Sequence, residues 1–217
     1  MNGWQIFMPL MAAGALTVAA DAAQTATNPK TEALIGQLTQ QIDASEKASP
    51  ELKVFVKQHL LPLCTNPVFV QQVKAQNAKQ RPLAEIQKID QEWVQAEDEL
   101  PIHREVMDNA CAREIRKITA QVRVIGETFV MDNQGANVGQ NELTSDYWQG
   151  DEPKWQNAYA KGKGGVEFGK PKLDKSTNTV DQKISLPIFD EQGMVIGAVC
   201  FGVNPDQGAL AAVTDGS

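Results

Sequence analysis

Residues 184–203, ISLPIFDEQGMVIGAVCFGV, decide the fold of this chain. Their first part alternates apolar residues with other types, at Ile184, Leu186 and Ile188, which is the period of a strand with one buried face. The tetrapeptide DEQG at 190–193 then has Asp at the first position of a turn and Gly at the fourth. The apolar run 195–203 completes the segment. The stretch therefore predicts a β-hairpin.

The same kind of turn occurs upstream, after residues 124–131, which are rich in β-branched and aromatic types. That run ends in DNQG at 132–135, so it predicts a second hairpin and, in all, an antiparallel sheet of about five strands. Between the hairpins, Asp151, Glu152 and Pro153 are typical of a first helical turn, and Gly162 of a helix end. We therefore expect a short helix inserted into the sheet, within residues 144–162.

The N-terminal half has the period and punctuation of helices. Apolar residues recur at every fourth position at Leu34, Leu38 and Ile42. The later helices are expected over 51–61, over 68–79 after the Asn-Pro pair at 66–67, from 83 to about 93, and as one long helix over 102–122. The sequence therefore predicts an α+β fold in which N-terminal helices precede the sheet.

The first residues differ from the rest of the chain. No charge occurs from Trp4 to Ala20, and the run ends in Ala20-Asp21-Ala22, a small-x-small pattern that signal peptidase accepts. We therefore predict a signal peptide at 1–22 and export to the periplasm, and a cytoplasmic N-terminal helix is the alternative. After residue 20, no apolar stretch reaches the roughly 18–20 residues that cross a bilayer, so no membrane span is expected once the signal is removed.

Composition excludes some partners and chemistries. The formal net charge of −7 over 217 residues disfavours a nucleic-acid partner, which needs a surplus of Lys and Arg on one face. Nucleotide-binding loops and the known nucleophile and metalloprotease motifs do not occur. Only His59 and His103 are present, and their spacing to Cys64 and Cys111 does not match a zinc site. We therefore predict neither an enzyme nor a metal site nor a cofactor.

The three cysteines include no C-x-x-C pair. In an oxidising compartment, one disulfide and one buried thiol would account for three cysteines. Cys64 and Cys111 both lie in the helical half, whereas Cys200 lies in an apolar strand. The hypothesis is a Cys64–Cys111 disulfide.

The order of helices, hairpin, inserted helix and closing strands resembles the Cache family, the PAS-like (PDC) extracytoplasmic sensor domains, in a stand-alone form with a single Cache domain. The resemblance rests on P-I-x-D-x-x-G-x-x-x-G-A at 187–198, FVMD at 129–132 with Gly135, and the block from Asp146 to Trp155. It implies a PAS-like sheet, a small metabolite bound between the sheet and the inserted segment, and homodimers formed through the N-terminal helices. The chain then divides into signal peptide (1–22), helical region (23–100), Cache-like domain (101–204) and loose tail (205–217).

A cluster of rings and charges is the candidate ligand site. Aromatic rings with polar tips suit a pocket for a small polar ligand, and neighbouring Asp and Lys side chains could bind its ammonium and carboxylate groups. Asp174 resembles the acid that Cache domains place in the strand facing the ligand. The predicted ligand-binding residues are Asp146, Tyr147, Trp148, Asp151, Lys154, Trp155, Tyr159 and Asp174. The alternative is that the rings only pack the inserted helix onto the sheet, while Asp151 complements the helix dipole and Asp174 forms a turn.

The sequence thus predicts a periplasmic, non-catalytic module that binds a small organic ligand, such as an amino acid or a carboxylate. Its signal would pass to a membrane receptor or another signalling protein. One alternative is a structural or interaction protein whose pocket is filled by its own side chains. The other is a metal-dependent hydrolase of unrecognised type.

Overall fold

The computed structural model describes residues 28–174 and 179–214 of the chain. Its N-terminal part is helical, and Asn66 begins a helix as predicted, because its side chain accepts hydrogen bonds from the N–H groups of Val68 and Phe69. The elements before the sheet are α1 (Pro29–Ala44), α2 (Pro50–Phe55), the π-helical turn η1 (Val56–Leu60), the 3-10 turn η2 (Leu61–Thr65), α3 (Pro67–Asn77), α4 (Leu83–Gln95), α5 (Pro101–Asp108) and α6 (Ala110–Gln121).

The single long helix predicted over 102–122 is wrong, because the chain breaks at Asn109. Asn109 has extended backbone angles, and its Oδ1 accepts a hydrogen bond from the N–H of Ala112, which caps α6. Its Nδ2 donates to the carbonyl of Glu105 in α5 and, over 2.6 Å, to the carbonyl of Val138 in β2 (Asn137–Gln140). One side chain therefore ends one helix, begins the next and fastens both to the sheet.

The sheet has the PAS-like antiparallel arrangement with an inserted helix that the sequence predicts. Its strands are β1 (Ile125–Met131), β2, β3 (Glu167–Phe168), β4 (Lys172–Asp174), β5 (Thr179–Phe189) and β6 (Val195–Val203), in the order β2-β1-β6-β5-β3, with β4 paired to the start of β5. The inserted helix is α7 (Pro153–Tyr159), followed by the 3-10 turn η3 (Ala160–Gly162). Gly162 has φ of 81°, in the left-handed region that favours glycine.

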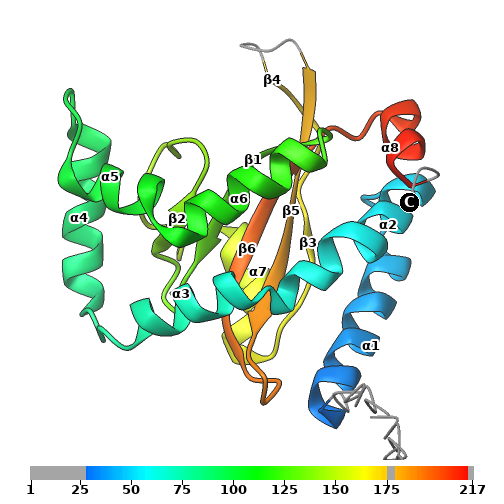
Figure 1. The fold of residues 1–217 in the computed structure, drawn as a ribbon, viewed down its shortest axis with the longest axis horizontal. Helices are drawn as coiled ribbons and strands as arrows, with labels where there is room; N and C mark the ends of the chain where they lie inside the picture. Colours follow the sequence, from blue (N-terminus) through cyan, green and yellow to red (C-terminus); the bar gives the residue numbers. More distant parts are fainter. Residues whose placement is uncertain (1–27, 175–178, 215–217) are drawn as a thin grey trace, which may run out of the picture.

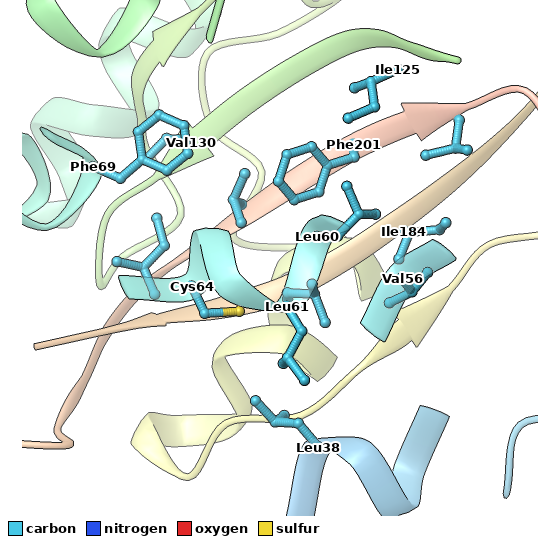
Figure 2. Packing of buried hydrophobic residues seen from close by; sticks show 14 of the residues in the cluster. Leu38, Val56, Leu60, Leu61, Cys64, Phe69, Ile125, Val130, Ile184 and Phe201 are labelled. Carbon is cyan, nitrogen blue, oxygen red and sulfur yellow. The ribbon is translucent and has the colours of Figure 1, made fainter. Parts of the chain in front are cut away.

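The two faces of the sheet are covered differently (Figure 1). Helices α1, α2, α3 and α6, with the turns η1 and η2, pack on one face and form the main hydrophobic core with the strands. Figure 2 shows part of this core, where Leu60 of η1 lies near Phe201 of β6 and Ile184 of β5. On the other face, α7 packs against Phe129, Met131 and other residues of β1 and β6.

A separate small core joins α4 and α5 to the inserted segment. Ile86 and Trp93 of α4, Val106 of α5, Ala136 and Tyr147 are buried together. The α4–α5 pair lies at one side of the molecule, beyond β2 (Figure 1). The segment between β2 and α7 is therefore held from outside the sheet.

The predicted Cys64–Cys111 disulfide is wrong, because the structure has all three cysteines as free, buried thiols. Cys64 lies in η2 within the main core, and Cys111 lies in α6 against β2, where a Cβ on Gly139 would be 2.6 Å from the Cys111 Cβ. Burial raises the pKa of each thiol, that of Cys200 to about 11. The number of cysteines in the sequence could not show that all three are buried as free thiols in apolar surroundings.

Part of the predicted loose tail is ordered. Residues Gln207–Thr214 form the helix α8, and its Leu210 is fully buried in the main core. The end of the described chain therefore packs against α2 and contributes to the main core.

The thiols provide a direct check of this packing. We expect no alkylation of native protein by iodoacetamide at mildly alkaline pH, because thiolates are disfavoured in an apolar core. In denaturant without reductant, all three cysteines should be alkylated, as read by peptide mass spectrometry. Recovery of a disulfide-linked peptide pair would contradict the structure.

The tail provides a second check. We expect Leu210→Ala to lower the free energy of unfolding by about 2–4 kcal/mol, because it removes a fully buried side chain. The exposed Met194 gives the matched control, and Met194→Ala should change stability by less than about 0.5 kcal/mol. Urea unfolding followed by tryptophan fluorescence measures both. Equal stability of the two variants would mean that the tail is loose.

Candidate ligand-binding site

The structure divides the predicted ligand residues between two places. Tyr147 is 1% exposed and lies beside Trp93, with ring centroids 5.8 Å apart. Its hydroxyl accepts a hydrogen bond from Arg81, and burial raises its pKa to about 12. Trp148 donates from its indole N–H to the carbonyl of Gln134 over 2.7 Å. These two rings therefore pack in the small core with α4.

Helix α4 holds this segment with two polar contacts. One carboxylate oxygen of Asp90 accepts hydrogen bonds from the backbone N–H groups of Tyr147 and Trp148, at 2.9 and 2.8 Å. The indole N–H of Trp93 donates to the carbonyl of Thr144 over 2.9 Å. Asp90 and Trp93 are thus positioning residues that the sequence interpretation missed. The sequence signal for this pair was that Asp90 and Trp93 are three positions apart, which places them on one face of a helix.

Trp155 and Tyr159 lie on α7 and pack it onto the sheet. Their rings are stacked with centroids 5.0 Å apart, and Trp155 packs against the cluster that includes Phe129 and Ala158. The indole N–H of Trp155 donates to the carbonyl of Asp132 at the end of β1 over 2.9 Å. Both rings therefore fix the inserted helix, which favours the packing interpretation of these aromatics.

The acidic residues of the predicted site do not gather around one point. Asp146 is half-buried and accepts a hydrogen bond from the side chain of Gln149, whereas Asp151 is exposed. Asp174 is the last residue of β4 and pairs with Thr179, but its side chain lies outside the described residues.

A pocket of about 380 Å³ lies where the start of α7 meets β3, β4 and β5. Lys154 is the predicted ligand residue that lines it. The lining residues are Glu152, Pro153, Lys154, Glu167, Gly169, Lys170, Lys172, Asp181, Lys183 and Ser185. We name this cavity the α7 pocket.

Strand β5 supplies one wall of the α7 pocket by simple alternation. Ile184 and Leu186 point into the main core, so Asp181, Lys183 and Ser185 lie on the opposite face, towards α7. Ser185 is fully buried, and its side chain lies beside the thiol of Cys200, its partner on strand β6. The alternation was visible in the sequence, and extending it back to residue 181 would have found this wall.

Lys183 forms ion pairs with two carboxylates, and we name the three residues the Lys183 triad. Its Nζ lies 2.5 Å from Oε2 of Glu127 and 2.7 Å from Oδ2 of Asp181. Burial disfavours the ammonium, but the bonds to Asp181 and Glu127 outweigh it and hold the pKa of Lys183 above its usual range. Gly202 makes room for this triad, because a Cβ there would lie 2.7 Å from Asp181 and 2.8 Å from Lys183. Two carboxylates sharing one ammonium leave one negative charge in excess.

Three further lysines line the α7 pocket, and Lys172 lies directly across from Asp181 on the paired strand β4. Lys154 pairs with Glu152 over 3.1 Å and lies 5.3 Å from the centroid of the Phe129 ring. Lys170 and Lys172 are exposed and form no ion pair with any other described residue. The α7 pocket therefore has both ammonium and carboxylate groups in its lining.

A third element reaches the α7 pocket from the N-terminal helices. Glu167 accepts hydrogen bonds from Lys47, just after α1, over 2.9 Å and from Asn157 of α7 over 2.8 Å. Gln37 and Gln41 of α1 bond the loop just before β3, at the carbonyl of Gly164 and the N–H of residue 166. The rim of the pocket is thus attached to α1.

A second pocket of about 380 Å³ lies on the other side of the triad. It shares Asp181 and Lys183 with the α7 pocket and is also lined by Arg123, Glu127 and Glu142. Its rim residues Arg123 and Glu142 are exposed. The triad therefore separates two hollows on one face of the sheet.

Comparisons with known proteins find similarity only at the level of solved structures. No protein-family model and no curated protein matches the chain. The sensor domain of the V. cholerae histidine kinase DctB aligns at 14% identity over 84% of this chain and 60% of that one, with a TM-score of 0.44. The ligand-binding domain of the Campylobacter jejuni chemoreceptor Tlp3, in complex with L-valine, aligns at 13% identity over 85% of this chain and 68% of that one, with a TM-score of 0.36.

The ligand-binding domain of Mlp24 with asparagine aligns at 14% identity over 81% of this chain and 59% of that one, with a TM-score of 0.30. These three structures are sensor and ligand-binding domains, and this chain spans about 60% of the first of them. At such low identities and TM-scores, no ligand or partner transfers from these proteins to this chain.

The triad can be tested by its charge balance. We expect Lys183→Met to lower the free energy of unfolding by about 1–3 kcal/mol, because it leaves two half-buried carboxylates without their cation. The value is below that of a fully buried pair, because 33% of the Lys183 side chain is exposed. The triple variant Glu127→Gln, Asp181→Asn, Lys183→Met should regain most of the loss, since no charge remains. A single variant as stable as the parent in urea would contradict the triad.

Proposed function

We propose that this chain is a non-catalytic sensor module that binds a small zwitterionic metabolite of the amino-acid class in the α7 pocket. The observation that carries the proposal is that charged side chains of both signs line that pocket together. The acids are Glu152, Glu167 and Asp181, and the lysines are Lys154, Lys170, Lys172 and Lys183. A ligand with an ammonium and a carboxylate on neighbouring carbons matches this arrangement.

The dimensions of the pocket support a small ligand. A volume of about 380 Å³ lies at the lower end of the range for small-molecule sites. The lining is mostly charged, so a polar metabolite fits better than an apolar one.

The groups around the pocket are poor catalysts. Lys183 is held as an ammonium by two acids, so it is a poor general base. Cys200 has a pKa raised to about 11 by burial, which disfavours the thiolate that a nucleophile needs. No group of three His, Cys, Asp or Glu side chains in the described ranges is placed to hold a metal ion. These features favour binding over the metal-dependent hydrolase.

We further propose that the module works in the periplasm and passes its signal to a membrane receptor or another signalling protein, with a homodimer formed through the N-terminal helices. The predicted signal peptide at 1–22 lies outside the described residues. Among the described residues, none of the helices has the length and apolar character needed to cross a membrane. The bonds from Gln37, Gln41 and Lys47 to the pocket rim support a signal path through α1.

The rival function is an interaction protein in which side chains fill the pocket. Tyr147, Trp148 and Trp155 favour it, because they serve packing in this structure. The open, charged α7 pocket favours binding.

A thermal-shift screen of the twenty L-amino acids and of short carboxylates tests the proposal, because a ligand of the native state raises its melting temperature. For a compound that binds, we expect Asp181→Asn to weaken affinity by about 10–100-fold, the value of a charged hydrogen bond. Asp151→Asn is the matched control, since Asp151 is exposed in the turn before α7 and does not line the pocket. No shift with any compound, or equal affinity in both variants, would contradict the proposed site.

A further inference from the structure

A buried polar cluster lies beneath the segment that leads from β2 to α7. Asn137 and Gln140 of β2 and Gln149 of the loop are fully buried, and Thr144 is 8% exposed. Amide and hydroxyl groups removed from water need partners, and each one left without costs free energy. We name Asn137, Gln140, Thr144 and Gln149 the amide cluster.

Most of the donors of the amide cluster are used within it. Nδ2 of Asn137 donates to Thr144 Oγ1 over 2.9 Å and to the carbonyl of Asp146 over 3.3 Å. Nε2 of Gln149 donates to the same carbonyl over 3.1 Å and to the Asp146 carboxylate. The two hydrogens of each of these amide groups are therefore committed.

Three side-chain atoms of the cluster have no partner among the described residues: Oδ1 of Asn137, Oε1 of Gln149 and Nε2 of Gln140. All three are enclosed by protein. Two are carbonyl oxygens that accept, and one is an amide nitrogen that donates.

The orientation of the Gln140 amide does not remove this imbalance. The hydroxyl of Thr144 has one hydrogen, and its 2.7 Å contact to the carbonyl of Asp146 uses it, so Oε1 of Gln140 at 3.4 Å receives nothing. If the amide is turned by about 180°, one N–H reaches Thr144 Oγ1 and the other stays free. Either orientation leaves at least one free N–H and two free carbonyl oxygens.

We propose that the amide cluster binds one internal water molecule. The water donates its two hydrogens to Asn137 and Gln149 and accepts one from Gln140, which gives the about three hydrogen bonds that buried waters usually form. With the Gln140 amide oriented as in the structure, a metal cation does not match the same three atoms, because the N–H of Gln140 points positive charge at it. In that orientation the inventory of donors and acceptors selects water, and a turned amide is distinguished by the metal test below.

The water has a structural role independent of any ligand. It connects β2, through Asn137 and Gln140, to the loop at Gln149, three residues before Glu152 at the rim of the α7 pocket. Asp90 and Trp93 of α4 hold the same loop from its other side. The water and α4 together fix the approach to α7.

The variant Gln140→Met tests the proposal through the sign of its effect, because Met keeps the length of the side chain and removes the donor. With water bound, the substitution leaves the water a hydrogen bond short, and we expect the melting temperature to fall by about 2–4 °C. In a dry cluster it removes an unsatisfied amide, so stability is unchanged or rises, and that result would overturn the proposal. Gln71→Met, at an exposed position of α3, is the matched control and should leave the melting temperature unchanged.

Two further measurements cover other outcomes. A crystal structure of the parent protein should show a water at about 2.7–3.2 Å from the three atoms, whether or not Gln140→Met folds. The melting temperature should be the same in EDTA and in millimolar CaCl₂. A metal-dependent shift, lost in Asp146→Asn, would overturn water as the guest, and so would a site without density.

Discussion

The two-sided character of β5 is the constraint on which the rest of this structure depends. The strand lies between β6 and β3, with Ile184, Leu186 and Ile188 on one face in the main core. Strict alternation then places the charged residues on the face that α7 covers. Charges at a partly covered position need compensation, and Lys183 with its two acids provides it. A glycine at 202 on the neighbouring strand provides the space.

The inserted segment between β2 and β3, which includes α7, is fixed by hydrogen bonds from two sides. On one side, Asp90 and Trp93 of α4 bind its backbone. On the other, Trp155 fixes α7 to the end of β1. The large rings of the segment therefore supply packing, and the charged side chains between α7 and β5 supply the chemistry of the candidate site. The result is a pocket between α7 and the sheet that is lined mainly by charged side chains.

Much of the fold could be predicted from local patterns, because hairpin turns, strand alternation and helix caps are encoded by neighbouring residues. The antiparallel sheet with its inserted helix and the start of α3 at Asn66 and Pro67 follow from such signals. The break at Asn109 could not be read from apolar periodicity, since the same stripe continues through it. It depends on the contact of Asn109 with the carbonyl of Val138, which is distant in the sequence.

The site was harder to predict than the fold, because a ring that packs and a ring that binds a ligand look alike in a sequence. Which surface Tyr147 faces depends on α4, more than fifty residues earlier. Of the predicted ligand residues, Lys154 lines the α7 pocket. The acid that strand β5 contributes to the pocket is Asp181, which was not among the predicted residues. The state of the cysteines could not be predicted for the same reason, since disulfide pairing depends on where the three buried thiols lie in space.

An NMR titration tests the central claim most directly, that the charged face of β5 and the start of α7 form the binding site. Amide resonances of the ¹⁵N-labelled protein would be recorded while an equimolar mixture of L-amino acids is added. The account predicts that the perturbed amides concentrate at 152–154, 167–172 and 181–185, which border the α7 pocket. Perturbations centred on Tyr147 and Trp148, with the amides of β5 unchanged, would contradict it.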